Sequence, residues 1–393
     1  MAIKSLFKLY SSEVIVTFLG LVFGVFVARA FGLEAKGLLA GLGALIALGA
    51  VLSSLGVSYS AVKLGGYNTN RLLIIFSLIA SLISLLFLFF YDYFKPTQIN
   101  IINSSVELYL ILFFTIYNLQ SLAFILSRPN NKYYPMAIIF GQLCAFIVLF
   151  LMFITKEFQA TWIMLATSGG QFAISSYYLI RIHRPESNTN TNNIFEYLRM
   201  GLNQAPIIYI TAFSIHIPIL IISSISLTEA GLYSVAAASV LIIGKIPRLL
   251  HGMTIGGIVF RGEEVYNDFL KLQGIMLLMI VAFHLLASFL IGAMYGAPFL
   301  PAVPVSIILA YSMIPLLFIS LSEAKFIVFE KYNLLIAYKL VACSVLILEL
   351  FMINYLGLEI NAISVAWCVF IFRYISALLI FLTVRFQSIK VFS

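Results

Sequence analysis

Residues 362–384 read AISVAWCVFIFRYISALLIFLTV, and Arg373 is the one charged side chain in this run of 23 residues. An α-helix rises 1.5 Å per residue, so the run is long enough to cross the roughly 30 Å hydrocarbon layer of a membrane. It contains neither Gly nor Pro to interrupt a helix. The stretch therefore predicts a transmembrane helix.

The rest of the chain has the same character. Of its 393 residues, 62% are apolar and only 10% are charged, whereas soluble domains carry roughly 25% charged and about 45–50% apolar residues. Such a chain cannot cover a globular surface with polar groups, which excludes a soluble enzyme, a nucleic-acid-binding module and a disordered protein. The net charge of +8 is accounted for by cytoplasmic membrane loops, because these are enriched in Lys and Arg.

Twelve apolar runs, separated by clusters of charged residues, Pro and Asn, predict twelve transmembrane helices. The predicted spans are residues 11–31, 38–62, 72–91, 107–126, 136–154, 162–180, 200–222, 230–250, 272–293, 303–324, 332–353 and 362–384. No segment between them is long enough to fold as a soluble domain. The fold class is therefore an all-α integral membrane protein.

The basic residues predict the orientation of these spans. If the N-terminus is cytoplasmic, the inner segments hold fourteen Lys and Arg residues, and the outer segments hold only Arg29, Lys36, Lys95 and Lys156. Cationic loops are retained on the cytoplasmic side. Both termini of this multi-pass protein are therefore predicted to be cytoplasmic.

Two short motifs recur in the second half of the chain. LEAKGL at 33–38 is similar to LTEAGL at 227–232, and Lys132-Tyr133 recurs as Lys331-Tyr332. The repeat predicts two pseudo-symmetric six-helix lobes around a central cavity, residues 1–180 and 200–393, joined by a cytoplasmic linker at 181–199. A parallel repeat of this kind places the substrate site between the lobes and moves by rocking one lobe against the other.

Arg373 is the clearest case of a charged side chain near the middle of a predicted span. It lies about eleven residues, or ~16 Å, from either end of its span, too deep for its side chain to reach the interface comfortably. Such groups usually face a polar cavity, and the alternative is structural pairing with the backbone or a neighbouring helix. Arg29 lies at the outer end of the first span, where it is either an interfacial anchor or a substrate contact.

Three further polar side chains follow one another at a spacing of three. Lys245, Arg248 and His251 share one helix face, and Pro247 predicts a kink between them. The face is either the cytoplasmic edge of the eighth span or, if the helix continues, a basic stripe within it. His216 lies alone in an apolar run, as a hydrogen-bonded side chain or as a protonatable cavity residue.

The sequence lacks other kinds of functional group. No Asp or Glu lies near the middle of a predicted span, although a cation antiporter would need one to exchange ions, so the central cations favour an anionic substrate. There is no P-loop, no His/Cys cluster and no Gly-x-Ser-x-Gly motif, so we expect no catalytic residues, no metal and no cofactor. Cys144, Cys343 and Cys368 lie in apolar runs as small packing residues.

Several of these stretches also carry a family resemblance. ARAFGLEAKG at 28–37 and LGVSYSA at 55–61 resemble the opening of the oligosaccharide flippases, of the O-antigen repeat-unit type. These flippases belong to the multidrug/oligosaccharidyl-lipid/polysaccharide exporter superfamily. Further similarity lies at 200–202 (MGL), 228–236 (TEAGLYSVA) and 295–304 (YGAPFLPAVP). The opening and these three further regions are in register and cover nearly the whole chain.

The resemblance implies a twelve-helix exporter, not an enzyme, in a bacterial inner membrane. It implies that polyprenyl-diphosphate-linked oligosaccharides cross by alternating access, with membrane lipids and other polysaccharide-assembly membrane proteins as partners and no nucleic acid. Its cationic cavity residues would meet the diphosphate or acidic sugars. We expect Arg373, Lys245 and Arg248 to make these contacts, followed by Arg29 and His216.

Two alternatives to the flippase remain at this stage. The first is an integral-membrane polymerase that joins such repeat units, but polymerases resemble chains with a large outer loop carrying catalytic Arg residues. The second is a drug/cation antiporter on the same fold, which the missing central carboxylates disfavour. Relatives often carry an acidic residue near the position of His216, so ion coupling remains open.

Overall fold

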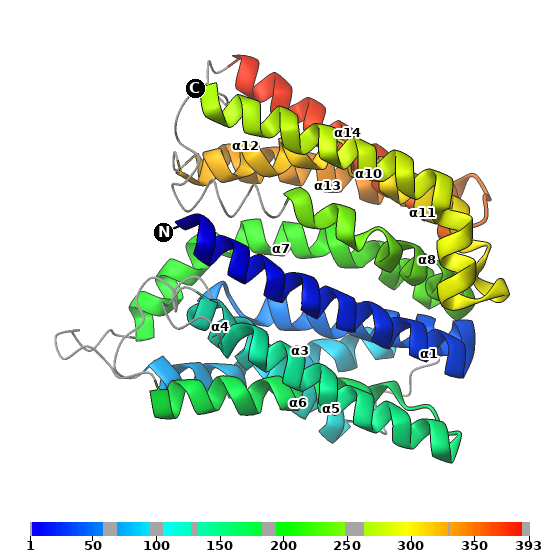
Figure 1. Ribbon diagram of the computed structural model, residues 1–393. Helices are drawn as coiled ribbons and strands as arrows, with labels where there is room; N and C mark the ends of the chain where they lie inside the picture. Colours follow the sequence, from blue (N-terminus) through cyan, green and yellow to red (C-terminus); the bar gives the residue numbers. More distant parts are fainter. Residues whose placement is uncertain are drawn as a thin grey trace. The chain divides into compact units, whose positions relative to one another are not determined.

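The computed structural model describes residues 2–57, 69–94, 105–126, 133–182, 194–247, 263–328 and 331–386. Within these ranges the regular elements are all helical (Figure 1). The main helices are α1 (Ala2–Ser53), α3 (Thr69–Phe94), α4 (Ser105–Leu126), α5 (Tyr133–Thr155), α6 (Ala160–Tyr177), α7 (Ile194–Ile225), α8 (Leu227–Ser239), α10 (Glu263–Tyr295), α11 (Ala302–Tyr311), α12 (Leu316–Val328), α13 (Tyr332–Tyr355) and α14 (Ala362–Phe386). The predicted all-α fold is confirmed.

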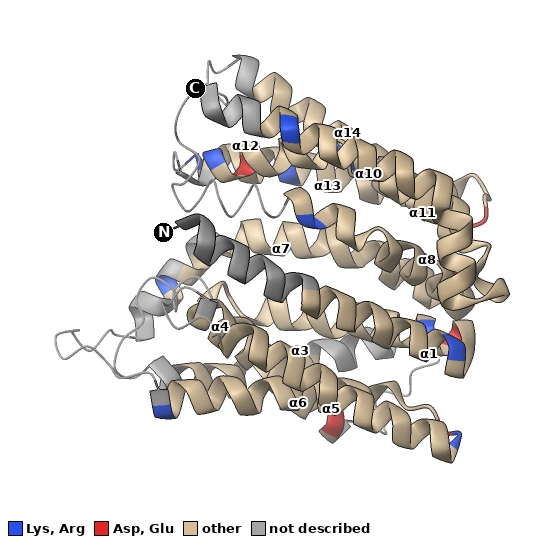
Figure 2. Ribbon diagram, viewed as in Figure 1, with Lys and Arg blue, Asp and Glu red and all other residues tan. Residues whose placement is uncertain are grey.

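These helices have the length and surface of membrane spans. Seven of the described helices are long and apolar enough to cross a membrane, or up to nine if each of two bent helix pairs is one span. Charged residues are sparse along the ribbons (Figure 2), and large apolar side chains such as Leu278 and Phe289 of α10 are each 71% exposed. This surface is stable in lipid, because lipid tails do not penalise apolar exposure.

Helix α1 covers two of the predicted spans. Its 52 residues are divided by a kink at Gly32, where φ is +85°. This backbone region is open to glycine and strained for other residues. One arm therefore ends at Gly32 and the next begins with the LEAKGL motif.

The chain divides into two compact units that do not follow the order of the sequence. Unit 1 comprises residues 1–6, 24–40 and 217–393, and unit 2 comprises residues 7–23 and 41–216. The stretch of α1 on both sides of Gly32 thus groups with the second half of the chain.

Unit 2 has a polar interior between α3, α4 and α6. The Asn118 amide nitrogen donates to the Ser168 carbonyl at 2.8 Å, and the Ser175 hydroxyl donates to the Asn118 amide oxygen at 3.3 Å. The Ser77 hydroxyl donates to Gln120 at 3.4 Å. Such hydrogen bonds between helices hold a bundle together in lipid, where apolar contacts alone provide little driving force.

In unit 1, the start of α8 is tied to the start of α14. Glu229 lies in the first turn of α8, and its Oε2 accepts a hydrogen bond of 2.8 Å from the Ala362 amide. Asn361 and Ser364 form a reciprocal cap at the same helix start, at 2.9 and 3.0 Å. The carboxylate thus meets the positive end of the α14 dipole, on the helix that carries Arg373.

Replacing Glu229 by Ala is expected to lower the unfolding free energy by about 1 kcal/mol, because one cap hydrogen bond and one charge–dipole contact disappear. The thermal midpoint of the purified protein in detergent measures the effect. Glu359 is an exposed acid close to the same helix start, and Glu359→Ala is the matched control. An equal loss in the two variants would contradict the assigned cap.

Candidate functional site

Arg373 lies part-buried inside unit 1, on α14. Its Nη1 donates a hydrogen bond of 2.7 Å to the Ser312 hydroxyl and lies 3.2 Å from the Met313 sulfur. Ser312 and Met313 are both buried. No carboxylate among the described residues pairs with this guanidinium, so its charge is held by a neutral hydroxyl and a thioether.

The partners of Arg373 lie where a span is broken. The helices Ala302–Tyr311 and Leu316–Phe326 are bent by 47° relative to each other. Pro315, in the break, has no amide hydrogen to donate, and the Gln273 side chain donates to the Ile314 carbonyl at 3.3 Å. Discontinuous helices of this kind form substrate and ion sites in many transporters.

A second broken span adjoins the first. The helix Leu227–Ser239 is followed by Leu241–Pro247 at an angle of 52°, and α11 packs against both α8 and α14. A Cβ built on Gly244 would lie 3.6 Å from the Met313 sulfur. The second arm of this span therefore reaches the first break, next to Arg373.

The arrangement favours an anionic ligand. A guanidinium has five N–H donors in a fixed fork that matches carboxylate and phosphate oxygens. Nη1 of Arg373 donates to Ser312 and to the Met313 sulfur, and no hydrogen bond joins Nε or Nη2 to a described residue. Charge-assisted hydrogen bonds to an incoming anion would satisfy them.

The other predicted site residues fall in different places. Lys245 is part-buried on the second arm of the broken α8 span, directly after Gly244, so it belongs to the region of the two breaks. Arg248 lies outside the described residues, as does His251. Whether α8 continues as a basic stripe is therefore still a prediction.

Arg29 contacts the end of α10, and His216 belongs to the other unit. Arg29 is exposed, and its Nε donates to the Met294 carbonyl at 2.7 Å while Nη2 donates to the Ala293 carbonyl. It thereby caps the last turn of α10, where free carbonyls accumulate. His216 is part-buried on α7 and belongs to unit 2.

The structure also shows charged groups that sequence reasoning did not select. Glu323 of α12 pairs with the Lys339 ammonium at 3.0 Å and accepts a hydrogen bond from the Tyr338 hydroxyl. Glu349 of α13 has one buried carboxylate oxygen with no hydrogen-bond partner among the described residues. Lys36 lies part-buried against Gly24. Glu323, Lys339 and Glu349 lie within predicted spans, and Lys36 lies four residues after the kink at Gly32, which was the available signal.

No group of three or more metal-ligating His, Cys, Asp or Glu side chains occurs among the described residues. The three cysteines are free thiols, of which Cys343 and Cys368 are buried. Neither observation points to a metal centre.

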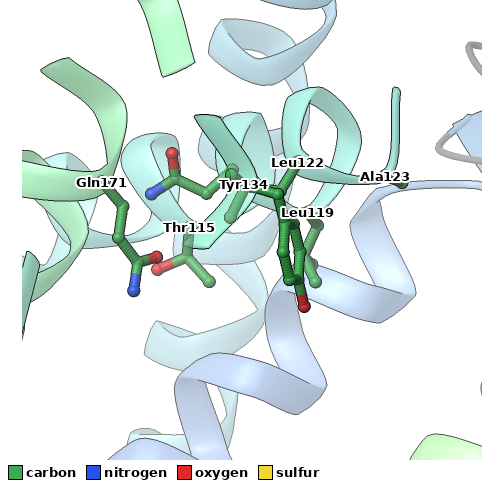
Figure 3. A pocket seen from close by; sticks show the side chains of 7 residues that line it. Thr115, Leu119, Leu122, Ala123, Tyr134 and Gln171 are labelled. Atoms are coloured by element: carbon green, nitrogen blue, oxygen red, sulfur yellow. The ribbon is translucent and has the colours of Figure 1, made fainter. Parts of the chain in front are cut away.

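A cleft of about 370 Å³ opens in unit 2, lined by Thr115, Asn118, Leu119, Leu122, Ala123, Tyr134 and Gln171. Figure 3 shows its side chains, with the Gln171 amide and the Thr115 hydroxyl turned toward one another. The described lining carries no charge, so this cleft does not supply the cation that an anionic ligand would need.

Comparisons with known proteins yield similarity in structure only. No protein-family model matches the sequence, and no curated protein matches it. Among solved structures, an inward-facing multidrug resistance MATE family transporter of the MOP superfamily is similar with a TM-score of 0.69 and 14% identity, over 95% of this chain and 94% of that chain.

Two further solved structures are similar over almost the whole chain. The lipid II flippase MurJ, in an inward closed conformation, has a TM-score of 0.69 and 16% identity, over 96% of this chain and 87% of that one. An outward-facing MATE family transporter has a TM-score of 0.63 and 14% identity, over 96% and 92%. The chain therefore has the fold of the MOP superfamily of membrane transporters.

Proposed function

We propose that the protein is a flippase that moves polyprenyl-diphosphate-linked oligosaccharide repeat units, such as O-antigen units, across a bacterial inner membrane. The observation that carries the proposal is Arg373, a guanidinium without a described carboxylate partner where two broken spans meet. A part-buried cation of this kind stabilises an anion and repels a cation. The diphosphate supplies that anion in every substrate of the class.

In the proposed mechanism, the diphosphate and the sugars enter from the cytoplasm while the lipid tail stays in the bilayer. The two lobes predicted from the repeat, residues 1–180 and 200–393 with the linker 181–199, then rock to expose the head group outside. Lys245 and Arg248 would assist Arg373, and Arg29 and His216 would make further contacts with the substrate. No bond is made or broken, so the protein acts as a transporter and not as an enzyme.

The MATE-like alternative, a drug or cation antiporter, needs a carboxylate that is free to exchange its ion. Glu323 is not free, because Lys339 pairs with it and the Tyr338 hydroxyl donates a hydrogen bond to it, whereas Glu349 keeps one buried carboxylate oxygen without a described partner. The cation at the two breaks also opposes a cationic drug. The neighbour that moves a lipid-linked molecule, the lipid II flippase, supports the proposed substrate class.

Deleting the protein from its host is expected to cause single lipid-linked repeat units to accumulate on the cytoplasmic face, because head groups of this size do not cross a bilayer unaided. Extraction of undecaprenyl-linked units and their accessibility to an enzyme added from each side measure the effect. Single units displayed on the outer face would indicate a polymerase instead. Unchanged lipid-linked units with altered drug sensitivity would indicate an antiporter.

A further inference from the structure

Lys36 of α1 lies beyond the kink at Gly32 and folds back onto the preceding arm of the same helix. A Cβ built on Gly24 would lie 2.9 Å from the Lys36 ammonium nitrogen and 3.9 Å from Cε. Gly24 is buried and Lys36 is part-buried. The bare backbone at Gly24 therefore makes room for the ammonium group.

This ammonium has no counter-ion among the described residues, and no hydrogen bond joins it to any of them. Two other cations of unit 1 have partners, since Arg29 binds two carbonyls and Lys339 pairs with Glu323. An unpaired charge held inside a protein is unfavourable unless water or a ligand compensates it. A methionine at position 36 would fill similar space without this penalty.

The backbone that carries Lys36 is held firmly in place. A Cβ on the next residue, Gly37, would lie 2.8 Å from the Leu227 carbonyl carbon and 2.9 Å from the Gly231 nitrogen. Two stretches of backbone thus cross there in direct contact. Seven residues before Lys36, Arg29 is fixed to the end of α10. The fold therefore fixes the backbone from which the Lys36 side chain extends to Gly24.

We propose that Lys36 is a second anion-binding residue of the transport path, which takes the phosphate oxygens of the diphosphate at a point distinct from Arg373. The proposal rests on the proposed function, because it assumes an anionic head group that enters unit 1. A lysine ammonium binds phosphate as a point charge, with three donors that reorient freely. Gly24 is then a positioning residue, since it sets where the ammonium rests.

The test uses the full-length protein in nanodiscs of phosphatidylcholine, with farnesyl diphosphate as the probe and uncharged farnesol as its control. Lys36→Met is expected to weaken diphosphate binding about tenfold, the loss of one hydrogen bond to a charged group, and to leave farnesol binding unchanged. Gly24→Ala is expected to weaken it severalfold by displacing the ammonium. Gly20→Ala, one turn earlier and with no atom within 4 Å of its Cβ, is the matched control and should bind normally.

Stability separates a binding role from a structural one. Lys36→Met should keep or raise the thermal midpoint, because it removes an uncompensated charge, whereas a structural lysine would lower it. Normal binding by Lys36→Met together with loss of binding by Arg373→Ala would overturn the role of Lys36 and leave the proposed function standing. Failure of the wild-type protein to bind the probe would count against the proposed function itself.

A membrane phospholipid is the other source of phosphate oxygens at such a site. Nanodiscs that contain phosphatidylglycerol distinguish the two sources. If the anionic phospholipid displaces the probe from wild-type protein and Lys36→Met abolishes this competition, the site is a phospholipid site and the proposal is wrong. Undiminished probe binding supports the proposal.

Discussion

Arg373→Ala is expected to abolish export of the oligosaccharide while the protein still inserts into the membrane. The side chain supplies the cation at the two breaks, and a hydrogen bond to a charged group contributes about 1.5–3 kcal/mol, or roughly 10- to 100-fold in affinity. Removal of the arginine leaves Ser312 and Met313 without this partner. Both are uncharged, so we expect the free energy of unfolding to change little. Surface polysaccharide in a deletion strain that carries the variant measures export.

Two controls accompany this substitution. Arg373→Lys keeps the charge but loses the planar fork and the reach to Ser312, so we expect intermediate export. Arg181 is an exposed arginine at the end of the sixth predicted span, and Arg181→Ala should export normally. Wild-type export by Arg373→Ala, at wild-type protein level in the membrane fraction, would refute the assigned role.

The second large effect is expected for the substitutions Gly37→Ala and Gly231→Ala. A Cβ on Gly231 would lie 3.0 Å from the Leu33 carbonyl carbon and closer still to its oxygen, just as one on Gly37 would strike Leu227. Both obstacles are backbone atoms, so no side-chain rotation relieves the overlap. Either alanine must push the two stretches apart, and we expect loss of export together with a thermal midpoint lowered by several degrees.

The direction of the change in thermal midpoint is informative, because replacing Gly by Ala normally stabilises a helix. In an open helix position Gly→Ala gains up to about 1 kcal/mol, which is the expected result for Gly20→Ala and Gly274→Ala, whose Cβ atoms would meet nothing within 4 Å. Thiol labelling of Ala230→Cys, at a fully buried position, in a background without the native cysteines reports opening of the crossing. Equal behaviour of all four alanine variants would contradict the backbone contact.

Most of the helices were predictable from the sequence because each long apolar run has one stable outcome in a membrane. The predicted spans 107–126, 136–154 and 332–353 differ by at most three residues at either end from α4, α5 and α13. The LEAKGL and LTEAGL motifs contain the residues whose backbones are in contact. The similarity of the two motifs did not indicate that they touch each other.

The details of the site were not predictable, because they depend on contacts between distant residues. Residues 230–250 and 303–324 were each predicted as one span, with a kink in the first at Pro247, yet the first bends after Ser239 and the second bends between Tyr311 and Leu316. Pro315 gave a local signal for one bend. Nothing local to Arg373 identifies Ser312 as its partner, and nothing near Lys36 shows that the side chain rests on Gly24.

The membership of residues 24–40 in unit 1 has a consequence for biosynthesis. This stretch is synthesised long before its partner, because Arg29 binds carbonyls 264 and 265 residues later in the chain. At a translation rate of about 5–20 residues per second, tens of seconds pass between the synthesis of this stretch of α1 and the synthesis of the end of α10. Unit 1 therefore cannot be completed before residues 293 and 294 are synthesised, and a nascent chain stalled before residue 293 leaves Arg29 without these two carbonyls.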